Sequence, residues 1–129
     1  MTSPIIVPEM QMRMDGQSPI AAAGQSLVVQ EWSGSGPVYM HVHHSDDEAW
    51  HVLEGKLTFK FIDKQIEAPA GTTIFVPAGV PHTYFDPGES SRYLIILTPR
   101  LRELISELES APLEQHKAIM RKYDSEILE

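Results

Sequence analysis

Short runs rich in Val, Ile, Phe, Tyr and Thr fill the sequence from residue 25 to residue 98, and they constrain the fold more than any other feature. Gly and Pro interrupt these runs at intervals of roughly ten residues, a pattern typical of an antiparallel barrel or sandwich. About eight strands are expected, because each run is short and shows the β-branched and aromatic residues that strands favour. They are predicted at residues 26–32, 38–43, 49–53, 57–62, 65–68, 72–76, 82–86 and 91–97.

The hydrophobic period changes after residue 98. Apolar residues now recur at helical spacing, with Thr98 as a plausible N-cap and Pro99 at the first helical position. A second helix is expected after Pro112. The residues predicted to face inward are Leu101, Leu104, Ile105 and Leu108 in the first helix and Leu113, Ile119, Met120 and Tyr123 in the second. We interpret this extension, about residues 99–129, as a packing or dimerisation element.

The length of 129 residues fits a single domain over residues 1–129, with a barrel core at about residues 25–98. Before that core, Met10, Met12 and Met14 alternate with polar residues, which places three thioethers on one face of a strand and favours core or dimer packing. Cysteine is absent. A bound metal ion therefore needs nitrogen and oxygen ligands.

The charge balance argues against two classes of partner. The formal net charge is −8 at a pI near 5.1, so no basic surface is expected for nucleic acid or for an anionic membrane. No apolar run approaches the length that spans a bilayer, and the first ten residues do not read as a secretory signal. A cytoplasmic protein that binds a small molecule is the expectation.

Four polar side chains are the candidates for a metal site. Side chains two apart on a strand share a face, so His41 and His43 are expected to project together. A polar loop then leads to Glu48, which is able to come alongside them, and His82 adds a third imidazole if its strand lies across the barrel. Imidazole and carboxylate are ligands that Fe, Mn, Ni, Co or Zn accept.

The spacing of these residues forms a motif in which two histidines are followed by a glutamate and a glycine. His41 and His43 are separated by one residue, Glu48 follows after four more and Gly55 after six more. This arrangement resembles the first signature motif of the cupin superfamily. The glycine that opens the motif is imperfect, since Gly36 stands one residue closer to His41 than in the usual pattern. We attribute that difference to a loop variation.

A second motif resembles the other cupin signature, which reads as a glycine, five residues, Pro-x-Gly, two residues, His, three residues and Asn. Gly71, Pro77, Gly79 and His82 match it, and Asp86 replaces the terminal asparagine. With eight positions matched, a coincidence is negligible, since each residue type has about 5% background usage. The resemblance covers about residues 36–86.

The resemblance to small, single-domain cupins of type 2 implies an all-β fold, a double-stranded β-helix or jelly-roll, here with C-terminal α-helices. It implies one divalent transition-metal ion held by His41, His43, Glu48 and His82. It also implies a homodimer formed through the outer sheet. The alternative is a metal-free barrel in which Glu48 hydrogen-bonds to the histidines.

The remaining histidines are expected outside the site. His44 lies on the opposite strand face and His51 beside Trp50, so both are interpreted as surface or interface residues. His116 falls in the second predicted helix, on a face that we expect to be solvated.

Three aromatic residues share strand faces with the expected ligands and are predicted to bind the substrate: Tyr39, Trp50 and Tyr84. No lysine falls in the predicted interior and the position of Arg92 is ambiguous, so the pocket favours a flat, largely apolar or phenolic molecule over a phosphate. The simpler alternative is that these aromatic residues are core.

The fold fixes no reaction, since cupins include oxygenases, isomerases, decarboxylases and binding proteins. Our leading hypothesis is a metal-dependent dioxygenase in which Glu48 is the catalytic residue, either remaining a ligand or accepting the substrate's proton. A sensory or binding barrel without turnover is the second hypothesis. A metal-dependent isomerase or decarboxylase is the third, and it needs a further acid or base that the sequence does not identify. Ligand types shared by several ions leave the native metal and the substrate open.

Overall fold

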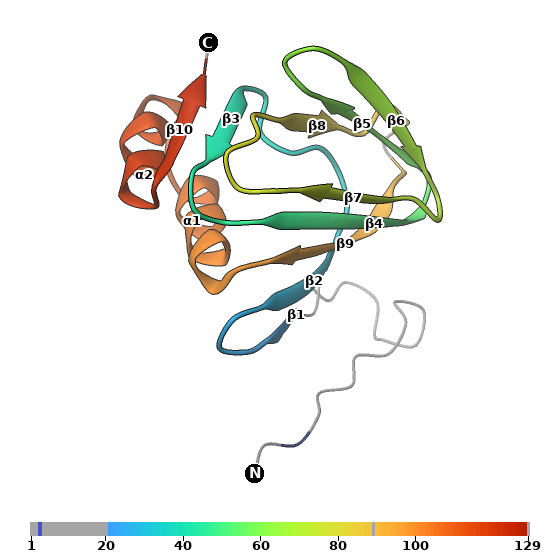
Figure 1. The fold of residues 1–129 in the computed structure, drawn as a ribbon, viewed down its shortest axis with the longest axis horizontal. Coiled ribbons are helices and arrows are strands. Elements are labelled where there is room, and N and C mark those ends of the chain that lie inside the picture. The colour runs from blue at the N-terminus through green and yellow to red at the C-terminus, as the bar shows by residue number, and fades with distance from the viewer. Residues whose placement is uncertain (1–2, 4–20, 89, 129) are drawn as a thin grey trace.

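The computed structural model describes residues 3, 21–88 and 90–128, and its ribbon is drawn in Figure 1. Within this part of the chain the elements follow one another as β1 (Ala21–Ala23), β2 (Val28–Trp32), β3 (Met40–His43), β4 (Glu48–Glu54), β5 (Lys56–Lys60), β6 (Gln65–Pro69), β7 (Thr73–Val76), β8 (Thr83–Phe85), β9 (Arg92–Leu97), α1 (Pro99–Glu109), the 3-10 turn η2 (Leu113–Gln115), α2 (His116–Lys122) and β10 (Ser125–Leu128). The methionines at 10, 12 and 14 lie outside the described residues.

The strands form two antiparallel layers. One is a five-stranded sheet in the order β1-β2-β9-β4-β7. The other contains the three-stranded sheet β6-β5-β8 and the pair β10-β3, which an isolated bridge between His41 and His82 joins beside β8. Figure 1 shows the two layers closing on each other around a common interior. This double-stranded β-helix with C-terminal helices confirms the predicted fold class.

The core lies between the layers and is built by strand alternation. In β9, Tyr93, Ile95 and Leu97 are buried, while the residues between them are half-exposed. Trp50 of β4 and Phe59 of β5 meet across the interior with ring centroids 5.0 Å apart. Burying such side chains contributes about 1.5–3 kcal/mol each. The layers are therefore held together mainly by the apolar interior that surrounds the site.

Helix α1 begins and packs as the sequence predicts. The Thr98 hydroxyl accepts from the Leu101 N–H at 3.2 Å, and Pro99 occupies the first turn. Leu104 is 1% exposed and Leu108 9%, so the apolar stripe faces the barrel. Asp46, in the loop before β4, attaches the start of the helix by accepting from Thr98 Oγ1 at 3.0 Å and from Arg100 Nη2 at 2.8 Å.

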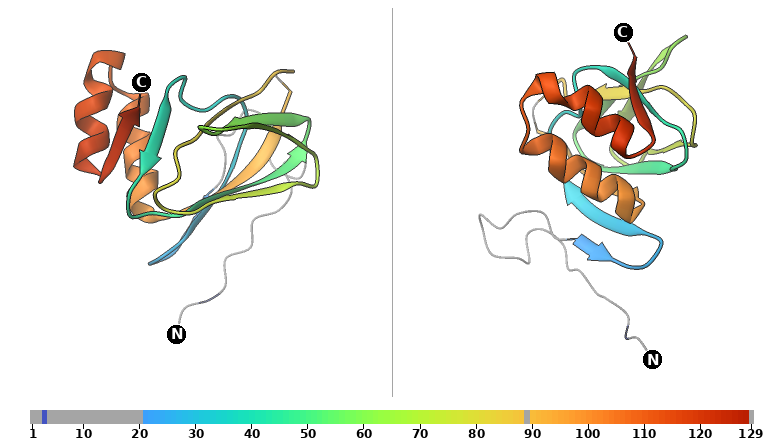
Figure 2. Two further views of the ribbon diagram at one scale, coloured as in Figure 1. Left: turned by 45° about the horizontal axis from the view of Figure 1, so that its top comes forward. Right: turned by 90° about the vertical axis from the view of Figure 1, so that its left-hand side faces the viewer.

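The segment after α1 differs in detail from the prediction. Leu113, expected to face inward, lies in a 3-10 turn with 63% of its surface exposed, whereas Met120 is buried at 1%. The chain then returns as β10 and pairs along the whole length of β3, from Ser125 opposite His43 to Leu128 opposite Met40. Figure 2 shows α1 and α2 together at one end of the barrel, beside this strand pair.

Two strands were not predicted. β1 is a run of alanines, and β10 is a four-residue strand that follows a helix. Two glycines in turns between strands have positive φ, 74° at Gly55 and 90° at Gly79, conformations that other residues rarely adopt. No helix among the described residues is both long enough and apolar enough to cross a membrane.

Candidate metal centre and adjoining cavity

Three histidines from two segments of the barrel form the centre of the candidate site. His41 and His43 alternate along β3 and share a face. His82 lies beside them because its backbone pairs with that of His41, each N–H donating to the other's carbonyl at N···O distances of 3.1 and 2.9 Å. The three rings lie with centroids between 4.4 and 5.5 Å apart. One nitrogen of each ring lies within 4.8 Å of the other two, a spacing at which the group can hold a metal ion.

Glu48 lies against two of these histidines. Its Oε1 is 3.4 Å from His43 Nε2 and 3.3 Å from His82 Nε2. The preceding loop is fixed by Asp47, whose carboxylate accepts from the Ala78 N–H at 2.8 Å, while Gly79 N–H donates to the His43 carbonyl at 2.7 Å. These bonds hold the start of β4 and the loop before His82 at a set distance from β3.

The other nitrogen of each ring has a partner that fixes the tautomer. Nδ1 of His41 lies 3.2 Å from the Tyr39 carbonyl and Nδ1 of His82 lies 3.0 Å from the Val80 carbonyl. A carbonyl only accepts, so both Nδ1 atoms carry the hydrogen. In each neutral ring, Nε2 therefore presents its lone pair.

His43 reaches the same state through a hydroxyl. Its Nδ1 is 2.7 Å from Ser125 Oγ, and that hydroxyl donates its single hydrogen to the Tyr123 carbonyl at 3.1 Å. Oγ is therefore an acceptor, and His43 Nδ1 must donate. Such outer partners are the usual means of orienting metal-binding histidines.

The three histidines form a group that could hold a metal ion, and Glu48 lies against two of them. All are buried, at 1–6% exposure. Burial, together with the neighbouring imidazoles of His82 and His43, lowers the pKa of His41 to about 3. Burial alone would raise the pKa of Glu48, but a hydrogen bond from Nε2 of His43 or His82, when that ring is protonated, outweighs burial and brings the pKa below its ordinary value. With neutral rings, two Nε2 lone pairs face an ionised carboxylate, a repulsive arrangement that a cation among these donors would relieve. Nitrogen and oxygen donors of this kind fit a divalent transition metal.

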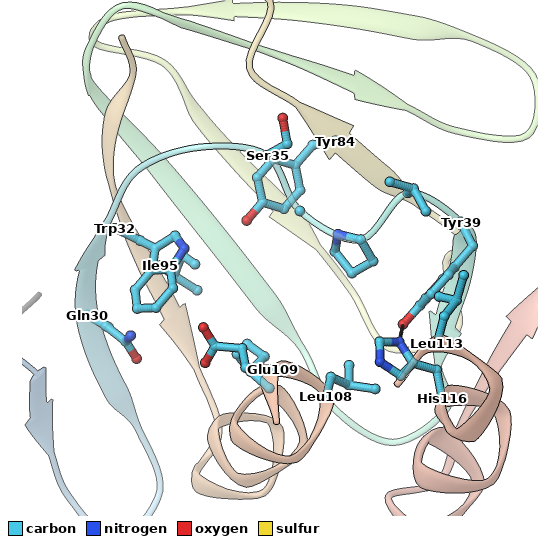
Figure 3. Close-up of a pocket in the computed structure, with 14 residues that line it drawn as sticks. Gln30, Trp32, Ser35, Tyr39, Tyr84, Ile95, Leu108, Glu109, Leu113 and His116 are labelled. Atoms are coloured by element: carbon cyan, nitrogen blue, oxygen red, sulfur yellow. Dashed lines mark hydrogen bonds between the residues drawn. The ribbon is translucent and has the colours of Figure 1, made fainter. Parts of the chain in front are cut away.

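A cavity of about 360 Å³ lies beside this cluster, between the barrel and the C-terminal helices. Figure 3 shows Trp32, Ile95 and Tyr84 on the barrel side, with Leu108 and His116 on the helical side. Its lining is mainly apolar, and none of the described lining residues is lysine or arginine. The full lining is Gln30, Trp32, Ser35, Gly36, Pro37, Val38, Tyr39, Tyr84, Ile95, Ile105, Leu108, Glu109, Leu113 and His116.

Tyr39 lies between the cavity and the histidine cluster. Its ring meets His41 edge-on at a centroid distance of 6.1 Å, and its hydroxyl lies 2.8 Å from His116 Nδ1 (Figure 3). Burial raises the pKa of Tyr39 above its ordinary value, so the hydroxyl stays protonated at neutral pH. The prediction that His116 lies on a solvated face was wrong. The turn at Pro112 brings this side chain half-buried onto the cavity wall.

Tyr84 forms the inner wall of the cavity, in front of Trp50. Its hydroxyl lies 3.1 Å from that of Tyr93, which donates to the Gly34 carbonyl at 2.6 Å. Burial raises the pKa of Tyr84 to about 12. Trp50 contacts Tyr84 and His82 at ring centroid distances of 5.3 and 5.6 Å, but it does not line the cavity. Its Nε1 is buried and makes no hydrogen bond within the described part of the chain.

The structure brings His41, His43, Glu48 and His82 together, and it places Tyr39 and Tyr84 on the cavity wall. Sequence reasoning missed the partners that come from the last part of the chain. Ser125 gives no local signal, because a serine near a short strand is ordinary. His116 at four residues after Pro112 offered a weak signal, since a turn there redirects the helix.

Comparison with known proteins agrees with this geometry. The family model described as a cupin domain matches residues 27–97. A cupin-2 domain-containing protein from Shewanella frigidimarina is 27% identical, with a TM-score of 0.53, over 67% of this chain and 84% of that one. No curated protein matches the chain.

Two further solved structures share the fold at lower identity. KdgF from a Halomonas species is 16% identical with a TM-score of 0.55, over 64% of this chain and 79% of that one. Pac13 of Streptomyces, described as a nucleoside dehydratase and also solved with uridine, is 18% identical with a TM-score of 0.54. That match covers 83% of this chain and 72% of Pac13. At these identities the likeness concerns the fold.

Proposed function

Since this chain belongs to the cupin family, as the domain matched over residues 27–97 shows, we propose that it is a metal-dependent dioxygenase acting on a small, flat, largely apolar or phenolic molecule. One observation carries the proposal: three buried imidazoles have nitrogens within 4.8 Å of one another, the Glu48 carboxylate lies against two of them, and this group stands one ring away from an apolar cavity. A bound divalent ion with an open coordination position would supply a Lewis acid for a phenolate or enolate oxygen and a redox centre for dioxygen.

Each residue of the centre receives a role in this proposal. His41, His43 and His82 hold the ion through Nε2. Glu48 serves as the fourth ligand, because its Oε1 lies between His43 and His82 and is shielded from solvent. Acting as a base would require Glu48 to leave both imidazoles. We therefore favour the ligand role for this carboxylate.

The cavity residues orient the substrate and exclude water. Tyr39 and Tyr84 contact the substrate directly, whereas Trp50 supports Tyr84 and His82 from behind. Few polar groups and a mainly apolar lining are typical of sites for small organic molecules. A phosphate or a multiply charged carboxylate finds no cation among the described lining residues.

Metal analysis and oxygen uptake test the proposal. Protein purified without an affinity tag is expected to contain close to one transition-metal ion per chain. Samples loaded with iron, nickel or manganese are expected to consume dioxygen with at least one member of a panel of flavonols, catechols and diketones. The control is His82→Ala, which is expected to lose uptake. No uptake by any loaded sample removes the dioxygenase proposal.

A binding protein without turnover is the second candidate, and one observation favours it. None of the four proposed ligands lines the cavity, and the Tyr39 ring stands between the cavity and His41. A molecule in the cavity would then bias the metal centre without reaching the ion. Recovery of a bound catechol or flavonol chemically unchanged, after aerobic incubation with loaded protein, would select this candidate.

We also propose that two copies pair through the outer face of the five-stranded sheet. One row across that face is wholly apolar, since Ala22, Val29, Ile96, Ala49 and Phe75 are successive cross-strand partners. Phe75 is 61% exposed, which favours a partner at this face. Light scattering is expected to give the mass of a dimer for the wild type and of a monomer for Phe75→Glu. A monomeric wild type refutes the pairing.

A further inference from the structure

The cavity has walls of two origins. Its barrel wall lies within the matched family domain, residues 27–97, whereas the helical wall follows that domain. The helical side chains are Ile105, Leu108, Glu109, Leu113 and His116. Figure 3 shows Gln30 and Glu109 toward one end of the cavity, Tyr39 and His116 toward the other, and Ser35 and Tyr84 between them. A ligand in this cavity therefore meets both the barrel and the C-terminal helices.

A chain of hydrogen bonds fixes the direction of the Tyr39 hydroxyl. His116 Nε2 lies 3.1 Å from the Ala111 carbonyl, which only accepts, so Nε2 carries the hydrogen. In the neutral ring, Nδ1 is then an acceptor, and the Tyr39 hydroxyl donates to it across 2.8 Å. Because the single hydroxyl hydrogen of Tyr39 is used in this way, Oη offers only lone pairs to a ligand.

Tyr84 has the same polarity by an independent route. Tyr93 donates to the Gly34 carbonyl, so the hydrogen between the two tyrosine hydroxyls must come from Tyr84. Both phenol oxygens on the cavity wall therefore act as acceptors. Two such acceptors favour a ligand with a hydrogen-bond donor. The oxygen of an ether or a carboxylate has no hydrogen to donate, so its lone pairs would lie against the lone pairs of the tyrosine oxygens.

Size and charge narrow the ligand further. The cavity volume of about 360 Å³ lies at the lower end of the ~300–1,000 Å³ range of small-molecule sites, which suits a molecule of one or two rings. Trp32, Ile95 and Leu108 offer apolar contact area. Glu109 is the only carboxylate among the described lining residues, and none of them is lysine or arginine, which disfavours anions.

We propose that this cavity binds an uncharged, one- or two-ring molecule through a hydroxyl that donates to Tyr39 Oη, and that His116 sets this selectivity as a positioning residue. The inference rests on the proposed function for its substrate class. It adds that the ligand is recognised through its hydroxyl group, that Tyr39 accepts the hydrogen bond, and that His116 orients Tyr39. A family domain thus obtains its ligand selectivity from a helix that lies beyond the matched segment.

Three probes that differ in one group test the inference: 2-naphthol, 2-methoxynaphthalene and 2-naphthoate. Binding is measured by titration calorimetry on the full chain as purified, under argon, so that no oxygen-dependent turnover occurs. The wild type is expected to prefer 2-naphthol over its methyl ether by about tenfold, the value of one net hydrogen bond, and to bind naphthoate more weakly still.

The variants assign the preference to its residues. In Tyr39→Phe the ratio of the two affinities is expected to fall to about one, and in His116→Leu to about threefold or less, because the freed hydroxyl rotates and also donates. Tyr123→Phe is the matched control, since it removes a hydroxyl that bonds to Glu107 beside the same helices, and it is expected to keep the wild-type ratio. Thermal unfolding verifies that each variant is folded.

Several results would overturn the inference. These are equal affinities of the folded wild type for the alcohol and its ether, no binding of any probe, or an unchanged ratio in Tyr39→Phe. An unchanged ratio in His116→Leu, with both affinities lowered together, would give His116 a structural role only. Failure of the dioxygenase proposal is separate, because it appears as absent oxygen uptake while naphthol still binds under argon.

Discussion

The histidine cluster and the adjoining cavity are built on opposite principles. In the cluster, every donor is buried and each ring has one nitrogen fixed by a partner, so the side chains are held in place before any ion arrives. In the cavity, apolar side chains surround open space, and the fixed polar groups that the structure describes are the hydroxyls of Tyr39 and Tyr84 and the imidazole of His116. The cluster is organised for one kind of partner, whereas the cavity sets limits of size and polarity.

The two regions also differ in where their residues come from. His41, Glu48 and His82 all lie within residues 27–97, the span that the family shares. The helical wall of the cavity lies after it, from Ile105 to His116. The comparison teaches that the shared barrel carries the candidate metal ligands, while the extension that follows supplies one wall of the adjoining cavity.

Removal of a ligand should break the cluster most completely. His82→Ala takes away one imidazole and leaves Glu48 with a single histidine partner. We expect metal affinity to fall by more than the ~10–100-fold that loss of an outer partner costs. Metal content after dialysis against a weak chelator measures it. His44→Ala, next to the site but 47% exposed at its side chain, is the control and should retain the ion.

Acid should destabilise the metal-free cluster. The folded pKa of His41, about 3, lies below its unfolded value of 6.5, so the unfolded chain binds the proton first as the pH falls. The contribution of neutral His41 to the free energy of unfolding is therefore fully present above pH 6.5. It is lost as the pH falls toward 3, at about 1.4 kcal/mol per pH unit for one proton. Glu48, whose pKa is also lowered, adds a loss of the same sign below pH 4.5.

Urea unfolding of chelated protein at pH 7, 6 and 5 measures this slope. His41→Gln removes the titrating group and should flatten the dependence over that range. If the variant and the wild type show the same slope, the buried neutral His41 is not its source.

Loss of an outer partner should weaken the cluster without dismantling it. Ser125→Ala leaves His43 Nδ1 without its acceptor, so the ring loses its fixed orientation. A reduction in metal affinity of about 10–100-fold is expected from such changes. Competition with a chromophoric chelator measures the constant. Ser106→Ala on the exposed face of α1 should leave the affinity unaltered, and an equally unaltered Ser125→Ala would remove β10 from the metal centre.

A small addition at the cavity wall tests how closely that region is packed. A Cβ at Gly36 would lie 2.4 Å from Cε1 of the buried Tyr84 ring, so Gly36→Ala must displace the ring. We expect a loss of about 1–3 kcal/mol in the free energy of unfolding, together with weaker naphthol binding. Gly24→Ala meets only an ordinary 3.6 Å contact and serves as the control. Equal stability of the two variants would contradict this packing.

The smallest effect concerns the attachment of the helical wall. Thr98→Ala removes the cap of α1 and one hydrogen bond to Asp46. Chemical unfolding should report a loss of about 1 kcal/mol. Thr98→Ser, which keeps the hydroxyl, should recover most of it. If Thr98→Ser is as unstable as Thr98→Ala, the methyl group of Thr98, and not its hydroxyl cap, stabilises the helix.

Much of this structure follows from local patterns in the sequence. The spacing of His41, His43 and Glu48 depends only on strand alternation and one short loop, so the geometry is readable along the chain. Helix α1 carries its own start signal in Thr98 and Pro99. The family resemblance then placed these segments in a double-stranded β-helix, and the matched domain and the fold confirm it.

The remainder depends on contacts between distant segments. β1 consists of alanines, which carry little strand preference, and β10 has only four residues. His116 reaches Tyr39 across 77 positions of sequence, and Ser125 reaches His43 across 82. No local pattern encodes such contacts, because they arise from how α2 and β10 return to the barrel.

The return of β10 to β3 has a consequence for the order in which this protein matures. The strand with His41 and His43 leaves the ribosome long before its antiparallel neighbour, Ser125–Leu128, has been made. Throughout that interval β3 lacks this antiparallel neighbour. If the histidine cluster holds an ion as proposed, the ion would reach its final geometry only after the chain's closing segment has been translated, and it would not be a nucleus around which the barrel assembles.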